Sequence, residues 1–198
     1  MKKGFFLFFM ICGILQVYSQ NWNLKRDKKG IKVYTRKLDS SKINEYKAVM
    51  LVDSKVENVL NTITDGDNLW KWNYKTPESK KLKTISNTEY IFWMKNDLPW
   101  PLKNRDNVSH INVIPLNGGG YRIDINPDRS GILPPKDNTI RIVNFKGYWL
   151  IEPVGRLVKV TQQLYGDPGG SLPSWLLNSM LVAAPYHTFL DLKRLLEN

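Results

Sequence analysis

Residues 171–196, SLPSWLLNSMLVAAPYHTFLDLKRLL, predict one long C-terminal helix. Ser171 can cap this helix, and Pro173 is tolerated in its first turn. From Trp175 onward the side chains are apolar on nearly every side, which is typical of a helix buried inside a protein. Polar residues and Pro185 interrupt the apolar run and charged residues follow it, so we do not expect the helix to cross a membrane.

The chain before this helix reads as a series of short strands separated by turn residues. Ser54 followed by Glu57 forms a capping box, which predicts a short helix that ends at Asp65-Gly66. Regular spacing of short strands is typical of an antiparallel meander. We expect strands at 31–36, 45–52, 81–85, 89–95, 107–114, 121–126, 139–145, 147–154 and 157–165.

One helix cannot cover so many strands in a flat sheet, so the sheet must curve around it. We therefore expect an α+β protein with a helix-grip fold, in which a curved antiparallel β-sheet wraps around a long C-terminal α-helix. The helix and the strands need not touch everywhere in such a fold. A cavity between them is an available ligand site.

The first 19 residues differ in composition from the rest of the chain. Lys2 and Lys3 precede an apolar run at 4–15, and Val17 and Ser19 are small residues at the positions that precede a cleavage site. The apolar run is too short to span a bilayer. We expect a signal peptide over 1–19, a single domain over 20–198, and export to the periplasm or the outside of a bacterium.

The chain of 198 residues is basic, with 29 Lys and Arg against 18 Asp and Glu. The predicted signal peptide carries two lysines and Cys12, so 27 basic and 18 acidic residues remain, a net charge of +9 without a thiol. Disulfides and thiolate metal sites are therefore excluded from 20–198. The positive charge is scattered and not interleaved with aromatic residues. We expect weak attraction to an anionic membrane surface and no nucleic-acid partner.

Two stretches of the chain resemble the START (steroidogenic acute regulatory protein-related lipid transfer) domain family. Residues 99–106, PWPLKNRD, are similar to the proline-rich turn and Arg-Asp dipeptide that open a central strand in that family. The second stretch consists of four segments: residues 128–141, Gly147-Tyr148-Trp149, 159–161 and 172–178. Their order and spacing match the gating loop, the late strands and the C-terminal helix of a START domain.

The resemblance implies a protein that binds one lipid or other hydrophobic molecule between sheet and helix, with no covalent chemistry and no cofactor. Residues 126–139 would form the mobile lid of the cavity. Some sterol-binding members carry a buried arginine on the strand face that Ser109 and Val113 share. Ile111 stands at that position here, which disfavours a sterol-specific pocket. Arg105 and Asp106 are expected to form a structural ion pair or to anchor a turn.

Strand alternation suggests which side chains face the ligand. Buried amides such as Gln163 and Asn178 need hydrogen-bond partners, and a ligand can supply them. The polar contact with the ligand would come from one of these amides, from Ser109 or from Tyr165. The aromatic candidates could instead be ordinary core residues. The predicted ligand-binding residues are Ile91, Trp93, Ser109, Ile111, Val113, Trp149, Gln163, Tyr165, Asn178 and Leu181.

The residues offer little for catalysis. His110 and His187 are the two histidines, too few for a three-histidine zinc site, and the chain contains neither His-Glu-x-x-His nor Gly-x-Ser-x-Gly. We therefore expect no catalytic residue, metal or cofactor. Two alternatives stay open: a polyketide cyclase or aromatase that uses the same cavity, since related helix-grip cavities host such enzymes, and a ligand-free periplasmic interaction module.

Overall fold

The computed structural model describes residues 21–39, 41–170 and 172–198. The predicted signal peptide at 1–19 and the predicted cap at Ser171 lie outside the described residues. The helices are α1 (Val56–Thr64), the short 3-10 helix η1 (Leu69–Lys71) and α2 (Ser174–Glu197). The strands are β1 (Asn23–Lys28), β2 (Ile31–Leu38), β3 (Ser41–Val52), β4 (Glu78–Ser86), β5 (Glu89–Asn96), β6 (Asn104–Leu116), β7 (Gly120–Pro127), β8 (Thr139–Ile142), β9 (Asn144–Val154) and β10 (Leu157–Asp167).

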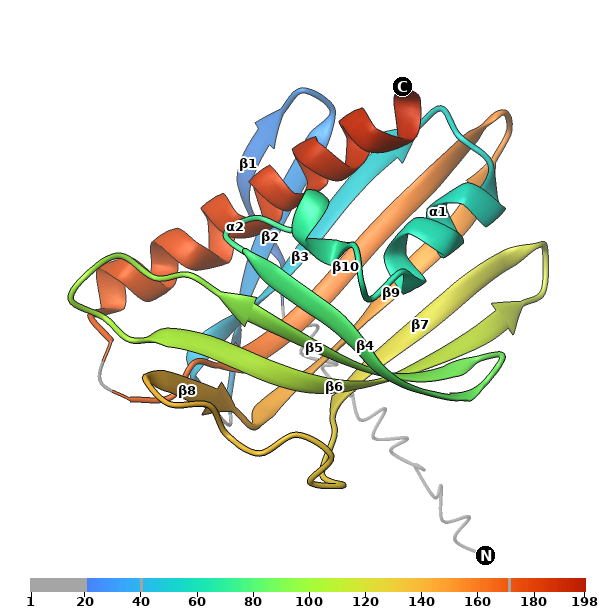
Figure 1. The fold of residues 1–198 in the computed structure, drawn as a ribbon. Helices are drawn as coiled ribbons and strands as arrows, with labels where there is room; N and C mark the ends of the chain where they lie inside the picture. The colour runs from blue at the N-terminus through green and yellow to red at the C-terminus, as the bar shows by residue number, and fades with distance from the viewer. Residues whose placement is uncertain (1–20, 40, 171) are drawn as a thin grey trace, which may run out of the picture.

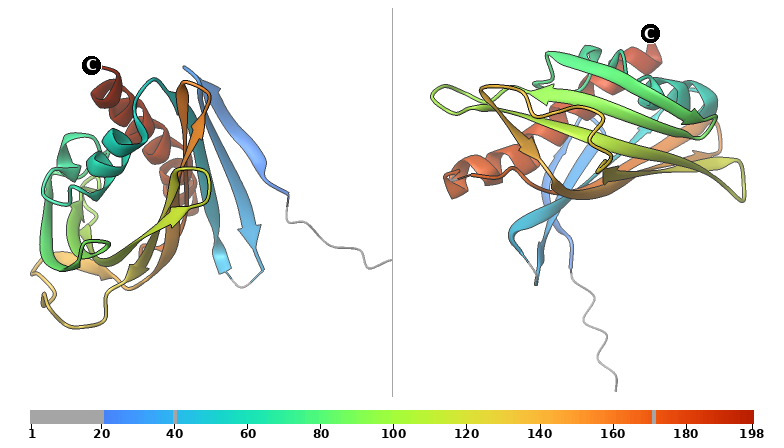
Figure 2. Two further views of the ribbon diagram at one scale, coloured as in Figure 1. Left: turned by 90° about the vertical axis from the view of Figure 1, so that its right-hand side faces the viewer. Right: turned by 60° about the horizontal axis from the view of Figure 1, so that its bottom comes forward.

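The strands form one sheet in the order β1-β2-β3-β10-β9-β7-β6-β5-β4, and every neighbouring pair along this path is antiparallel. β8 lies off the path and pairs in parallel with the start of β6. The sheet curves around α2, which crosses its concave side (Figures 1 and 2). The helix-grip prediction is confirmed. No helix among the described residues is long and apolar enough to cross a membrane.

The predicted strands are present, with two local differences. The expected strand at 139–145 is divided, because β8 ends at Ile142 and β9 begins at Asn144. β1 was not expected, because its sequence NLKRDK shows no apolar alternation. Its position is set by backbone pairing with β2, at an edge where charged side chains remain in water.

The predicted capping box of α1 is wrong. The helix begins at Val56 with Lys55 as its N-cap, and no side chain caps it. The Oγ atom of Ser54 is buried without a hydrogen-bond partner. Since the helix starts one residue later than expected, Glu57 stands one position too early in the helix to close the box.

The core lies between the concave face of the sheet and the C-terminal half of α2. Alternate residues of β2 and β3, such as Ile31 and Met50, point to this side and are fully buried. Phe189 and Leu192 of α2 are also fully buried, and the Phe189 ring stacks on Trp149 of β9 with 5.5 Å between centroids. Each such side chain contributes about 1.5–3 kcal/mol when it leaves water. This half of the helix is therefore firmly packed on the sheet.

The convex face carries a second, smaller apolar cluster that the sequence did not predict. Ile91, Trp93 and Val108 are buried there beneath Leu133 of the β7–β8 connection, residues 128–138, here called the outer strap. Figure 2 shows this connection outside the sheet, away from α2. The prediction that residues 126–139 form a lid over the cavity is therefore wrong: the segment covers the opposite face of the sheet.

Candidate functional site

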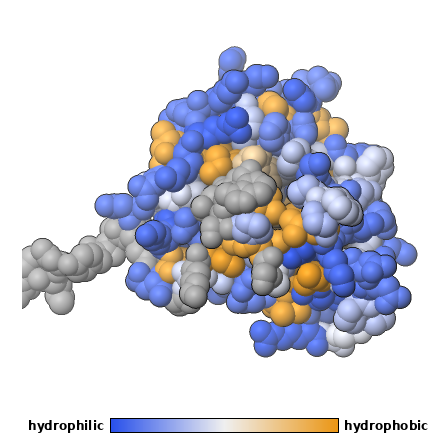
Figure 3. Space-filling model, turned by 90° about the vertical axis from the view of Figure 1, so that its left-hand side faces the viewer, coloured by the Kyte–Doolittle hydropathy of each residue, from blue (hydrophilic) through white to orange (hydrophobic). Residues whose placement is uncertain are grey.

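A cavity of about 480 Å³ lies between the concave face of the sheet and the N-terminal half of α2. This volume falls within the range of small-molecule binding sites. Its lining includes Leu98 and Pro99 of the β5–β6 connection and Leu176 and Leu177 near the start of α2. Figure 3 shows apolar surface framed by polar residues on this side of the molecule. Apolar wall residues include Phe92, Met94, Ile111, Ile123, Ile125, Trp149, Leu164, Leu176, Leu177, Met180 and Leu181.

The helix sequence explains why a space remains here and not farther along. Ala183, Ala184 and Pro185 line the cavity, and these short side chains do not reach the sheet. Phe189, one turn after Pro185, and Leu192, two turns after it, are large side chains that are fully buried. A densely packed protein interior leaves such a void only where the side chains are too small to close it. The change from small to large residues along α2 therefore marks the closed end of the cavity.

Two amides in the cavity are held by neighbouring hydroxyl groups. Gln162 on β10 is only 8% exposed, and its Oε1 accepts a hydrogen bond of 2.8 Å from the hydroxyl of Tyr46 on β3. Asn107 on β6 accepts a bond of 2.9 Å at Oδ1 from Ser109 Oγ. Burial raises the pKa of Tyr46 above its ordinary value, so its hydroxyl stays protonated and donates. Each amide therefore keeps its NH2 group for another acceptor.

Arg105 lines the cavity and is only 3% exposed. Its Nε donates to Pro168 O at 3.1 Å and its Nη2 to Gly169 O at 3.0 Å, while its Nη1 donates to Lys103 O. These bonds tie the start of β6 to the segment after β10. Removal from water lowers the pKa of the guanidinium from its ordinary value.

Asp106, the next residue, points to the convex face. Its carboxylate accepts two hydrogen bonds from Arg141 and one of 2.8 Å from the indole of Trp93. Arg105 and Asp106 therefore do not pair with each other, because successive side chains of a strand point to opposite faces. The turn-anchor role predicted for this dipeptide fits Arg105, and the ion pair belongs to Asp106 and Arg141.

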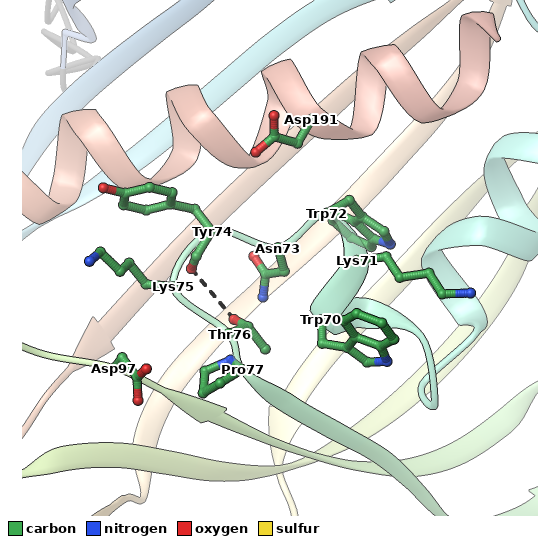
Figure 4. Close-up of a pocket in the computed structure, with 10 residues that line it drawn as sticks. All are labelled: Trp70, Lys71, Trp72, Asn73, Tyr74, Lys75, Thr76, Pro77, Asp97 and Asp191. Atoms are coloured by element: carbon green, nitrogen blue, oxygen red, sulfur yellow. Dashed lines mark hydrogen bonds between the residues drawn. The ribbon is translucent and has the colours of Figure 1, made fainter.

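The segment between η1 and β4 separates the cavity from a second hollow of about 310 Å³ on the outside, shown in Figure 4. Residues 72–75 and Asp97 line both spaces. Thr188 of α2 holds the segment in place: its Oγ1 accepts from the backbone N of Tyr74 at 3.1 Å and donates to Asn73 Oδ1 at 3.0 Å. This wall of the cavity is therefore anchored to the helix.

The structure brings four of the ten predicted residues to the cavity: Ser109, Ile111, Trp149 and Leu181. Val113 shares their side of β6 but lies farther along the strand, in the core. Asn178 belongs to α2, and its side chain lies outside the described part of the structure. The ligand contacts of all these residues remain predictions.

The other four predicted residues face away from the cavity. Ile91 and Trp93 belong to the convex cluster. Gln163 donates to Glu45 and accepts from Tyr148, each at 2.8 Å, and the Tyr165 hydroxyl lies 3.1 Å from that of Ser41, all on the convex side. Strand alternation divides the side chains into two faces but does not say which face points inward. On β5 and β10 both faces carry apolar or amide residues, so composition did not identify the inward face either.

Sequence reasoning therefore missed Phe92, Met94, Gln162 and Leu164. Strand register contains the signal that would have identified two of them. Phe92 stands opposite Ser109 and Gln162 stands opposite Trp149, and paired residues of antiparallel strands share a face. Ser109 and Trp149 were predicted to face inward. The correct strand pairing would therefore also have assigned their partners, Phe92 and Gln162, to the inward face.

Among the described residues, no group of three or more His, Cys, Asp or Glu side chains is placed to hold a metal ion. The cavity offers apolar walls, two oriented amides and one buried guanidinium. This arrangement can enclose an apolar molecule and hold a polar end of it by donated hydrogen bonds.

Comparison with known proteins gives consistent results. The family model described as START domain matches residues 15–187. An uncharacterised protein of Pseudomonas aeruginosa is 32% identical over 176 residues, covering 88% of this chain and 86% of that protein. Human phosphatidylcholine transfer protein is 27% identical over 179 residues, covering 86% and 83%. A crystal structure of a STAR-related lipid transfer protein from Xanthomonas axonopodis superposes with a TM-score of 0.82 at 31% identity, covering 89% of this chain and 99% of that one.

Proposed function

The chain belongs to the START domain family, and we propose that it binds one lipid or other hydrophobic small molecule in the cavity beneath α2, without covalent chemistry. The observation that carries this proposal is the apolar cavity of about 480 Å³, placed between sheet and helix. The names of the related proteins from human and Xanthomonas axonopodis support a lipid as the ligand class.

Apolar burial alone can supply the affinity. Each CH2 group that leaves water contributes about 0.8 kcal/mol, so a chain of about 16 carbons gains roughly 12 kcal/mol before the costs of association. Those costs remove a large part of the gain. The cavity therefore needs few polar contacts to retain a lipid, and the polar groups that it has can serve specificity.

We further propose that the protein exchanges its ligand at a membrane surface. Trp100 is 92% exposed and follows Leu98 and Pro99, two residues of the β5–β6 connection that line the cavity. Tryptophan favours the interface between membrane and water, and the net charge of +9 on residues 20–198 attracts anionic lipids. Replacing Trp100 by Ala should weaken sedimentation with anionic vesicles. Trp70→Ala, at an exposed tryptophan in η1, is the matched control and should have no such effect.

Residues 1–19 are proposed to direct export and to be removed. N-terminal sequencing of the protein recovered from outside the cytoplasm should then begin at Gln20. An N-terminus at Met1 or Lys2 would contradict this part of the proposal.

Native mass spectrometry tests the ligand proposal. The purified chain is incubated with a total lipid extract of the bacterial membrane, freed from vesicles and sprayed intact. One lipid bound per protein, identified after release, is the expected result. Protein that carries no lipid at any ratio would overturn the proposal, and a covalently altered product would point to the cyclase alternative.

A further inference from the structure

Arg105 is a buried cation that no described carboxylate neutralises. Ion pairs hold Asp106 and Glu45 elsewhere in the sheet, Glu89 is hydrogen-bonded to His110, and none of these contacts involves Arg105. Its partners are three backbone carbonyl oxygens. An uncompensated charge at 3% exposure is costly, because the charge has lost water without gaining an opposite charge. The lowered pKa of this guanidinium is consistent with that cost.

The hydrogen-bond inventory of Arg105 is incomplete in a specific way. A guanidinium carries five N–H groups, and the carbonyls of Lys103, Pro168 and Gly169 accept one each from Nη1, Nε and Nη2. One N–H on each terminal nitrogen is left without an acceptor in the described residues. Because Arg105 lines the cavity, a hydrogen-bond acceptor on a ligand inside the cavity can reach these two N–H groups.

Asn107 extends this row of donors. It lies two residues after Arg105 on β6, so both side chains point to the concave face about 7 Å apart. Both residues line the cavity. Because Ser109 occupies the amide oxygen of Asn107, the NH2 group is the part left for a ligand. Arg105 and Asn107 are here called the donor row.

The other charged residues of the cavity lining do not neutralise the donor row. Asp97 lines the cavity and the outer hollow, and its Oδ1 accepts from Asn104 at 2.9 Å. Lys75 is a cation that lines the same two spaces. Arg105 differs from both because it is almost fully buried and belongs to the cavity alone.

We propose that the ligand of this cavity is an amphiphile with an anionic oxygen head group, a carboxylate or a phosphate, which binds at the donor row. Its apolar chain would extend past Ile111 and Trp149 to the closed end beneath Ala184. This inference rests on the proposed function and narrows its ligand class.

The energetics favour an anion over a neutral head of the same size. Arg105 has already lost its water during folding, so binding adds no further desolvation of the cation. An oxyanion gains charge-assisted hydrogen bonds, which are roughly twice as strong as neutral ones. A hydrogen bond to a charged group corresponds to a factor of about 10 to 100 in affinity. An alcohol can accept a bond here but leaves the guanidinium unpaired.

The test compares ligands with identical chains. Binding of palmitate, hexadecyl phosphate and hexadecanol to the purified chain is measured by displacement of a fluorescent fatty-acid probe at neutral pH. At least one anionic ligand should bind about 10- to 100-fold more tightly than hexadecanol. Comparison of palmitate with hexadecyl phosphate then tells which oxyanion the donor row prefers. This comparison needs no variant of the protein.

A substitution checks the assignment to the donor row. Asn107→Asp keeps an acceptor for Ser109 and places a carboxylate beside Arg105, so the protein supplies its own counter-ion. The anionic ligand should lose at least about tenfold in affinity, and the preference for it over hexadecanol should disappear. Asn112→Asp makes the same chemical change at an exposed position of β6 and should alter neither.

Equal binding of the anionic ligands and hexadecanol would overturn this inference while leaving the proposed function intact. Failure of all three ligands to bind would overturn both. An anionic preference that survives Asn107→Asp would also contradict the assignment, because the head group would then lie away from the donor row.

Discussion

The guanidinium of Arg141 holds the carboxylate of Asp106 through two hydrogen bonds, from Nε to Oδ1 at 2.8 Å and from Nη2 to Oδ2 at 2.9 Å. Arg141 also donates to the carbonyl oxygens of Leu133 and Pro134, so it connects the outer strap to the central strand β6. The strap is therefore fastened to the convex face through a fully buried carboxylate.

Replacing Asp106 by Ala should strongly destabilise the protein. It leaves the guanidinium of Arg141 without its partner, and breaking a buried ion pair in this way costs about 3–5 kcal/mol. Urea unfolding measures the change in the free energy of unfolding. The control is Asp124→Ala, which removes the partner of Arg122 from a more exposed pair and should cost about 1 kcal/mol or less. Equal effects of the two substitutions would contradict this account.

Loosening the outer strap should not affect ligand release. Leu133→Ala removes the strap's apolar contact with the convex cluster, on the side of the sheet away from the cavity. We expect the rate of ligand release to stay within about twofold of wild type, since no residue of the strap lines the cavity. Stopped-flow transfer of the bound ligand to acceptor vesicles measures this rate. A tenfold acceleration would show that the strap controls access after all.

Gly147 of β9 has no room for a side chain. A Cβ atom there would stand 2.5 Å from the backbone oxygen of Gln163 and 2.5 Å from Leu164 Cδ1. Gly147→Ala should therefore cost about 1–3 kcal/mol in the free energy of unfolding, as overpacked sites do. Gly166→Ala is the matched control, because its Cβ would meet Phe145 Cβ at an ordinary 3.5 Å. Thermal or urea unfolding that fails to separate the two variants would refute the steric argument.

Tyr46 should make the protein sensitive to alkaline pH. Burial raises its pKa in the folded state above the value of about 10 expected in the unfolded chain. The folded state therefore holds this proton more tightly, so the stabilisation is complete below about pH 10 and is lost as the pH rises further. Tyr46→Phe should show a smaller loss of stability between about pH 9 and 11 than wild type.

Tyr46→Phe should also lower the free energy of unfolding at neutral pH. It removes the hydrogen bond to Gln162, a loss of about 1 kcal/mol. Tyr34→Phe, at a half-buried tyrosine of β2, is the control and should keep the wild-type pH profile. Urea unfolding across the pH range checks both, and a Tyr46→Phe profile that matches wild type would contradict the expected linkage.

The fold could be predicted because its signals are local and agree with each other. The apolar helix at 174–197 and the run of short strands leave one arrangement in which the sheet curves around the helix. β1 could not be predicted, because its residues gain their structure only from pairing with β2. The cap of α1 was misplaced by one residue, an error that a short polar signal easily produces.

The site could be predicted only in part. The resemblance pointed to the strand face that carries Ser109 and Ile111, and both line the cavity, as do Trp149 and Leu181. On β10 the adjacent amides Gln162 and Gln163 do not differ in character, and only the register shows that Gln162 points inward. The resemblance suggested a lid at 126–139, whereas contacts distant in sequence, such as that between Arg141 and Asp106, hold this segment on the other face.

The central claim is that a lipid occupies the space beneath α2, and a cavity-filling substitution tests it most directly. Native mass spectrometry with lipid extract is carried out on wild type, Leu181→Trp and Leu195→Trp; Leu181 lines the cavity, and Leu195 is exposed on the same helix. We predict one bound lipid for wild type and Leu195→Trp, and at least about tenfold less for a folded Leu181→Trp. Full lipid occupancy of Leu181→Trp would contradict the account.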